Sequence, residues 1–263
     1  MKKIISLGMG TQSSAMYLMS CLGIIDHADF AVFADTGAEH PETMKYAAWL
    51  IDWSKKNSDI PLYVATYKDI MKDIMKDIMK GQNSSGNRFA SIPAFTEGGG
   101  MVRRQCTMEY KITQVNKKVR EVLGIKKNHR MIPCEQWIGI TREEASRMKT
   151  SQQFNIANVY PVIEYRRGEL IQWMKDQGFP IPVKSSCTFC PYQSNARWND
   201  MKQNHPETFA QTIKVDENIR DSSKRGVKYK LFLHRSLVPI SEIDFNDSQL
   251  DMFGNECEGH CGL

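Results

Sequence analysis

The first 55 residues constrain the fold most, because they alternate two buried-strand patterns with two helical patterns. Residues 3–7 form a short apolar run that ends in a loop of glycines and hydroxyls, and a helical pattern follows over residues 13–23. A second apolar run, over residues 30–34, is followed by a polar loop and then by a helical pattern over residues 42–55. This alternation predicts a parallel α/β sheet, in which both polar loops lie at the carboxyl edge where such sheets bind ligands.

The loop after the first strand has the features of a phosphate-binding turn. A helix N-terminus presents unpaired N–H groups and a partial positive charge, and glycines let an anion approach the backbone closely. The loop lacks the Gly-Lys-Ser/Thr ending of a Walker A motif, and Ser13 stands where a dinucleotide-binding fingerprint has its third glycine. An ordinary strand-to-helix turn is the alternative. The residues we predict to bind a nucleotide are Ser6, Gly8, Gly10, Thr11, Gln12, Ser13, Ser14, Asp35, Thr36, Gly37 and Gly139.

Five short motifs follow one another along the chain. They occupy the segments Ser6–Ser14, Asp35–Thr43, Arg104–Ile112, Trp137–Glu144 and Tyr160–Glu164. Together they resemble the PP-loop superfamily, in particular its phosphoadenosine phosphosulfate (PAPS) reductase-like branch and the related ATP-pyrophosphatase-type sulfurtransferases. The resemblance covers about residues 3–192. It implies a doubly wound core of the HUP type (adenine nucleotide alpha hydrolase-like) that binds ATP or a PAPS-like adenine nucleotide. Gln12 stands where ATP-cleaving members often carry Asp, which fits the reductase-like branch.

The rest of the chain continues the α/β pattern and then changes character. We expect a PP-loop domain over residues 1–182 and a helical, irregular, cysteine-bearing extension over residues 183–263. Further strands are predicted over residues 60–65, 135–140 and 158–163, and further helices over residues 107–123, 167–177 and 232–237.

Composition and charge exclude few functions, but they narrow the possible partners and the expected cellular location. With 35 Lys+Arg against 30 Asp+Glu, the net charge of +5 permits a nucleic-acid substrate without requiring one. No apolar stretch approaches the ~20 residues of a membrane span. The short N-terminal apolar run is a first strand rather than a signal peptide, so we expect a cytoplasmic protein with no membrane partner. A homodimer is compatible with these features.

The seven cysteines indicate metal or thiol chemistry, because nothing in the sequence suggests export. Cys187 and Cys190 form a C-x-x-C followed by Pro, and Cys106 lies inside one of the family-like motifs. One alternative is a [4Fe–4S] cluster held by these three cysteines and one from the C-terminal tail, for which we take Cys261. A second is a structural zinc site of Cys187, Cys190, Cys257 and Cys261. A third is a set of free thiols.

The C-terminal residues 256–262 are similar to the Glu-Cys-Gly-x-His tail of sulfonucleotide reductases, with one residue inserted. That similarity implies Cys257 or Cys261 as a catalytic nucleophile beside His260. Arg142 follows a predicted strand and is our third candidate catalytic residue, for binding phosphate or sulfate, since arginine binds such groups bidentately.

Three functions remain open at the level of sequence. The first is sulfur transfer after adenylation of a substrate, as in nucleic-acid thiolation or phosphorothioation, with a separate sulfur donor and with Mg²⁺ as an optional cofactor. The second is reduction of an activated sulfate nucleotide by a thiol reductant, with release of sulfite. The third is a nucleotide- or nucleic-acid-binding module with structural zinc.

Overall fold

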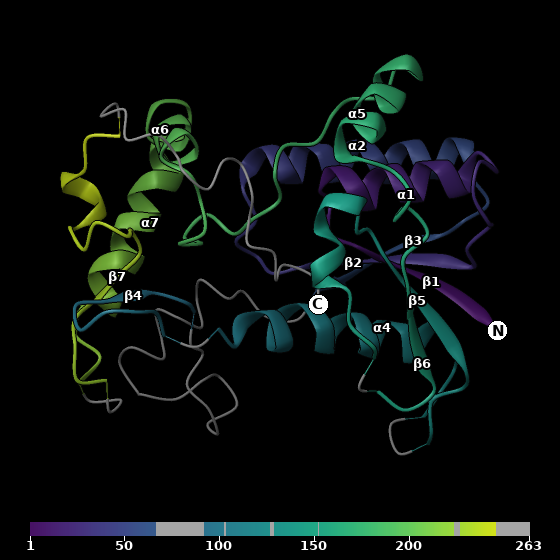
Figure 1. Cartoon of the computed structure of the whole chain (residues 1–263), viewed down its shortest axis with the longest axis horizontal. Coiled ribbons are helices and arrows are strands. Elements are labelled where there is room, and N and C mark those ends of the chain that lie inside the picture. Colours follow the sequence, from purple (N-terminus) through teal and green to yellow (C-terminus); the bar gives the residue numbers. More distant parts are fainter. Residues whose placement is uncertain (67–91, 103, 127–128, 152, 224–226, 246–263) are drawn as a thin grey trace.

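The computed structural model describes residues 1–66, 92–102, 104–126, 129–151, 153–223 and 227–245. Its centre is a five-stranded parallel sheet in the order β3-β2-β1-β5-β6 (Figure 1). The strands are β1 (Lys2–Leu7), β2 (Phe30–Asp35), β3 (Leu62–Thr66), β5 (Cys134–Ile138) and β6 (Ile156–Val159). The chain order reverses at β1, so the doubly wound α/β fold expected from the sequence is confirmed.

Helices cover both faces of this sheet. One face packs against α1 (Thr11–Cys21), α2 (Pro41–Asn57) and α5 (Arg167–Asp176), and the other against α4 (Thr113–Val122) (Figure 1). Neighbouring residues of β1 show the alternation that this arrangement needs. Ile5 belongs to the core beneath α1, whereas Ile4 belongs to the core beneath α4. A strand buried on both faces is continuously apolar, which explains the unbroken apolar runs in the sequence.

A second core forms in the C-terminal region. It contains α6 (Asn195–Asn204), α7 (Pro206–Ile219), the short 3-10 helix η4 (Ile240–Glu242), and an antiparallel pair of β4 (Phe95–Thr96) with β7 (Leu231–Phe232). Trp198 of α6 is fully buried at its centre. The helical C-terminal extension is therefore present, although Ala38, Ile92, Ala94 and Tyr110 from the preceding part of the chain share its core. The boundary at residue 182 stays a prediction.

Asp216 of α7 holds this region together with its carboxylate. Its oxygens accept hydrogen bonds from the backbone N–H groups of Leu233 (2.8 Å) and Ile240 (3.0 Å), and Arg220 forms an ion pair with it. The carboxylate is 1% exposed. Two backbone segments are thus fixed to α7 by one buried side chain.

Two predictions about secondary structure are wrong in part. The strand predicted over residues 158–163 ends at Val159, because Pro161 has no N–H for the sheet and the chain turns through Tyr160–Tyr165. The helix predicted over residues 232–237 is absent. Phe232 instead pairs in β7, and Leu237 adopts a left-handed backbone with φ of 57°.

No helix among the described residues is long and apolar enough to cross a membrane.

Candidate functional site

The predicted nucleotide-binding residues meet at the carboxyl ends of three adjacent strands, β2, β1 and β5. Gly10 is the N-cap of α1, and no side chain caps this helix. Among the described residues, the first N–H groups of α1 therefore have no capping side chain, as an anion-binding helix N-terminus requires. Met9, immediately before, is fully buried with a left-handed φ of 57°, a conformation rare for side-chain-bearing residues and typical of functional loops.

Gly139 connects β5 to this loop by direct backbone contact. A Cβ at this position would lie 2.6 Å from the Ser13 nitrogen and 2.8 Å from the Gln12 carbonyl carbon. Only glycine fits. The hydroxyl of Ser13 in turn accepts a hydrogen bond from the Gly8 N–H (3.2 Å) and donates one to the Gly10 carbonyl (3.2 Å). The loop is thus held rigidly from both sides.

Gln12 and Arg142 lie at the same edge but have different surroundings. The Gln12 amide donates to Glu144 (3.0 Å), which also forms an ion pair with Arg147. Glu144 and Arg147 both belong to the 3-10 helix η2 (Arg142–Arg147), which follows β5. Arg142 donates to the Glu164 carbonyl (2.6 Å), and its side chain is 56% exposed. Its role in binding phosphate or sulfate stays a prediction.

The loop after β2 leads from this edge to the predicted metal cysteines. Asp35 accepts a hydrogen bond from the Gly37 N–H (2.8 Å), and Gly37 has a φ of 77°, which favours glycine. The Thr36 hydroxyl lies 3.4 Å from the Cys187 sulfur and donates to Glu39 (3.3 Å). Glu39 also forms a bridge in the backbone with Cys187. The sheet edge and the C-x-x-C segment therefore form one continuous site.

Three of the four predicted metal cysteines, Cys106, Cys187 and Cys190, line a single pocket. Its wall also contains Thr36 from the sheet edge and two basic residues, Arg104 and Lys111; the remaining lining residues are Pro93, Thr107, Phe189 and Pro191. The pocket has an empty volume of about 430 Å³, open solvent included. Cys106 is the N-cap of the π-helical segment η1 (Thr107–Ile112), a rare geometry that is frequent at functional sites.

Burial, more than the neighbouring charges, favours the protonated form of Cys187. Burial raises the pKa of its thiol well above the ordinary value, the Glu39 carboxylate raises it further, and the Lys111 ammonium opposes both. Lys111 and Glu39 form an ion pair at 3.0 Å, and the Glu39 side chain is fully buried. A thiol in these surroundings is a poor free nucleophile, whereas a coordinating metal would deprotonate it outright.

The other cysteine predictions lie outside the described residues. Cys257 and Cys261, with the tail that carries them, belong to residues 246–263. Their catalytic and metal-binding roles stay predictions, and with them the choice between cluster, zinc and free thiols.

Two residues of the site were missed by the sequence argument. Glu39 is the buried partner of Lys111, and Gln193 fixes the C-x-x-C turn by donating to the Cys187 and Thr188 carbonyls (3.3 and 2.8 Å). A buried carboxylate or amide has no periodicity that would distinguish it from a surface residue. The partner of Glu39 is distant in sequence, whereas those of Gln193 are near, but only the folded structure shows either contact.

The fold and this edge together define an α/β protein with an open helix N-terminus beside a three-thiol pocket. No protein-family model matches the chain, and no curated protein sequence matches it. Among solved structures, it is similar to the phosphate complex of a phosphoadenylyl-sulfate (PAPS) reductase from Candida auris. The identity is 9%, 69% of this chain and 75% of that chain are covered, and the TM-score is 0.41.

A second similar structure is the U34-tRNA thiolase NcsA from Methanococcus maripaludis with its [4Fe-4S] cluster. Here the identity is 13%, 82% of this chain and 71% of that chain are covered, and the TM-score is 0.42. At these identities and TM-scores the two structures do not decide between reduction and thiolation, and that choice depends on the residues of this chain.

Proposed function

We propose that this protein is a PP-loop enzyme that binds ATP or a related adenine nucleotide and transfers sulfur to an adenylated substrate. The observation that carries the proposal is the 3.4 Å contact between the Thr36 hydroxyl and the Cys187 sulfur. It joins the predicted nucleotide edge to the thiol pocket, so that a reacting group at the nucleotide and a sulfur carrier at the thiols would share one space. The cytoplasmic location and a homodimer belong to the same proposal.

The chemistry has two balanced steps. An oxygen of the acceptor attacks the α-phosphorus of ATP, and the bond to pyrophosphate breaks, with pyrophosphate as leaving group. Sulfide, as the sulfur nucleophile, then forms a bond to the activated carbon or phosphorus of the acceptor and displaces AMP, which leaves with the acceptor oxygen. In this proposal the free N–H groups at the start of α1 bind the phosphates, and Asp35 binds the ribose or a Mg²⁺ ion.

The three thiols fit an iron–sulfur cluster. They come from two segments, line one pocket, and are accompanied by Lys111 and Arg104, which would offset the negative charge of thiolates and sulfide. We propose Cys106, Cys187, Cys190 and Cys261 as the ligands. Such a cluster would supply an iron site where sulfur is held. The residues of the chain would shield it, since the thiols lie inside the pocket rather than on an open surface.

The reductase alternative is favoured by one specific observation. Arg104 and Lys111 line the thiol pocket beside Thr36, which is a suitable environment for the sulfate end of a PAPS-like nucleotide. In that case a C-terminal cysteine thiolate would attack the sulfur and form a Cys–S bond, the nucleotide would leave, and a thiol reductant would release sulfite. The binding-module alternative requires zinc at the cysteines and no turnover.

The first experiment is anaerobic purification followed by a visible spectrum and assays for iron, sulfide and zinc. We expect a brown protein with about four irons per chain, from the cluster type proposed. Cys187→Ala should lose the iron, whereas the matched control Cys21→Ala, a cysteine at the end of α1 outside the pocket, should keep it. A colourless protein with one zinc would overturn the cluster.

The reaction is tested separately by product analysis. With ATP and pools of candidate acceptors such as RNA and DNA, we expect release of AMP and pyrophosphate and incorporation of labelled sulfur. Sulfite release from PAPS that is abolished by Cys257→Ser or Cys261→Ser would instead establish the reductase. Absence of both products in an iron-loaded protein would contradict an enzymatic role in sulfur chemistry.

A further inference from the structure

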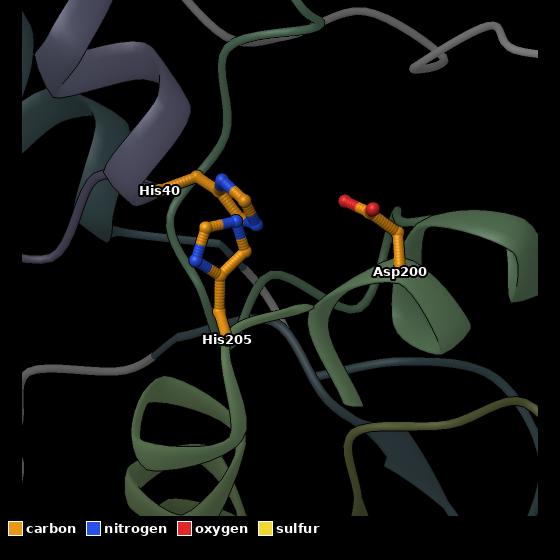
Figure 2. Close-up of side chains that lie close together, drawn as sticks. All are labelled: His40, Asp200 and His205. Atoms are coloured by element: carbon orange, nitrogen blue, oxygen red, sulfur yellow. The ribbon is translucent and has the colours of Figure 1, made fainter. Parts of the chain in front are cut away.

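A second group of metal-ligating side chains lies apart from the thiol pocket. His40, Asp200 and His205 each offer a ligand atom, and these atoms all lie within 4.8 Å of one another. Figure 2 shows the two imidazole rings side by side, with the Asp200 carboxylate facing them from across a gap. The three residues come from the start of α2, from α6 and from the start of α7, so only the fold brings them together.

One nitrogen of His40 is buried and is not engaged by any described residue. The side chain is fully buried at the N-cap of α2, where Nδ1 accepts a hydrogen bond from the Glu42 N–H at 3.3 Å. Its Nε2 atom is buried and has no hydrogen-bond partner among the residues that the structure describes. A buried polar atom of this kind is costly, and a bound ion would satisfy it.

The other two side chains complete the group and leave it accessible. The His205 ring packs edge-on against His40 with ring centroids 4.9 Å apart, and its Nε2 lies 3.9 Å from the Glu42 carboxylate. The Asp200 side chain is 40% exposed, which provides an entry path from solvent. Arg197 opposes a bound cation, because its guanidinium lies 3.8 Å from the Asp200 carboxylate.

We propose that His40, Asp200 and His205 bind a divalent transition-metal ion of the zinc, cobalt or iron(II) kind. Two imidazole nitrogens and one carboxylate oxygen are a common three-ligand set for these ions, with the remaining positions open to water. The Glu42 carboxylate lies where it can orient the His205 ring, as carboxylates do for metal-bound histidines.

His40 would bind an ion through Nε2, because its Nδ1 faces the Glu42 N–H at 3.3 Å as the N-cap of α2. Ligation through Nε2 places the ring proton on Nδ1 and ends this N-cap contact, a cost that metal binding must exceed.

The position of the site suggests what the ion does. His40 follows the Asp35–Gly37 loop of the nucleotide edge, and Asp200 and His205 belong to the helices that follow Cys187 and Cys190. An ion bound here would clamp the sheet-edge loop to the thiol-bearing region. This function is independent of the reaction proposed above.

The test is titration of the full-length protein with Co²⁺, followed by absorption spectroscopy and equilibrium dialysis. Cobalt at nitrogen and oxygen ligands gives visible bands without the intense near-ultraviolet band of a cobalt–thiolate bond, so this site is distinguishable from the cysteines. We expect one Co²⁺ without thiolate character per wild-type chain. His205→Gln and Asp200→Asn should weaken its binding by tenfold or more, while His27→Gln, at an exposed histidine, should not change it.

A second variant and a second readout keep the test decisive. Arg197→Met removes the guanidinium that lies 3.8 Å from the Asp200 carboxylate. It should tighten Co²⁺ binding by roughly fivefold or more, since two unit charges about 4 Å apart in water already repel by about that factor. Zn²⁺ should raise the melting temperature of the wild type and not that of His205→Gln. Equal Co²⁺ affinity and number in wild type, His205→Gln and Asp200→Asn, or cobalt bound only through thiolates, would overturn the proposal.

Discussion

Gly139→Ala should disrupt the contact between β5 and the loop before α1. The new Cβ would lie 2.6 Å from the Ser13 nitrogen, whereas ordinary van der Waals contact begins at 3.4 Å. Because the opposing atoms are backbone rather than a flexible side-chain end, the loop itself must move by roughly 0.8 Å. Overpacking of this size typically costs about 1–3 kcal/mol of unfolding free energy.

The same displacement should change the predicted phosphate site. The N–H groups of Gln12 and Ser13 belong to the first turn of α1, so a shift of the loop changes their direction toward a bound anion. We therefore expect Gly139→Ala to lower both the urea midpoint, followed by circular dichroism, and the affinity for ATP, followed by calorimetry.

Gly168→Ala is the matched control. Gly168 lies exposed in α5 and a Cβ there meets nothing within 4 Å. Alanine should be neutral or stabilise the helix by up to about 1 kcal/mol. If Gly139→Ala unfolds at the same urea concentration as the wild type and binds ATP equally well, the argument from close approach is refuted.

Two further predictions concern stability. Asp216→Ala should destabilise the protein by about 3–5 kcal/mol, since Arg220 and two backbone N–H groups lose a buried carboxylate; the exposed Asp176→Ala should change the urea midpoint little, and equal effects would contradict the reasoning. Burial, assisted by the Arg235 charge, lowers the pKa of His234 from 6.5 to about 4. The stability it contributes is therefore complete above pH 6.5 and lost as pH falls toward 4, by up to about 3 kcal/mol. His234→Gln should flatten this part of the stability–pH curve, measured with chelator present, and an unchanged curve would contradict the assignment.

The regular elements of the sheet domain were predictable because their signals are local. Apolar runs buried on both faces and Pro41 at a helix start indicate strands and helices without knowledge of the fold. The pairing of Phe95 with Phe232 was not predictable, because a two-residue strand has no periodicity and its partner is more than a hundred residues away. The early end of β6 at Val159 had a visible signal in Pro161.

The residues of the candidate site also fall into those that local sequence could predict and those that it could not. The glycines and hydroxyls of the first loop and the C-x-x-C were visible in the sequence, since their spacing reflects the chemistry directly. The sequence alone thus determined the fold class, while the nucleotide-binding role of the residues at the sheet edge stays a prediction. Only the tertiary structure placed Thr36 against Cys187, Glu39 against Lys111 and His40 against His205. Such contacts depend on how segments that are distant in sequence pack against one another, and no local pattern of residues encodes that packing.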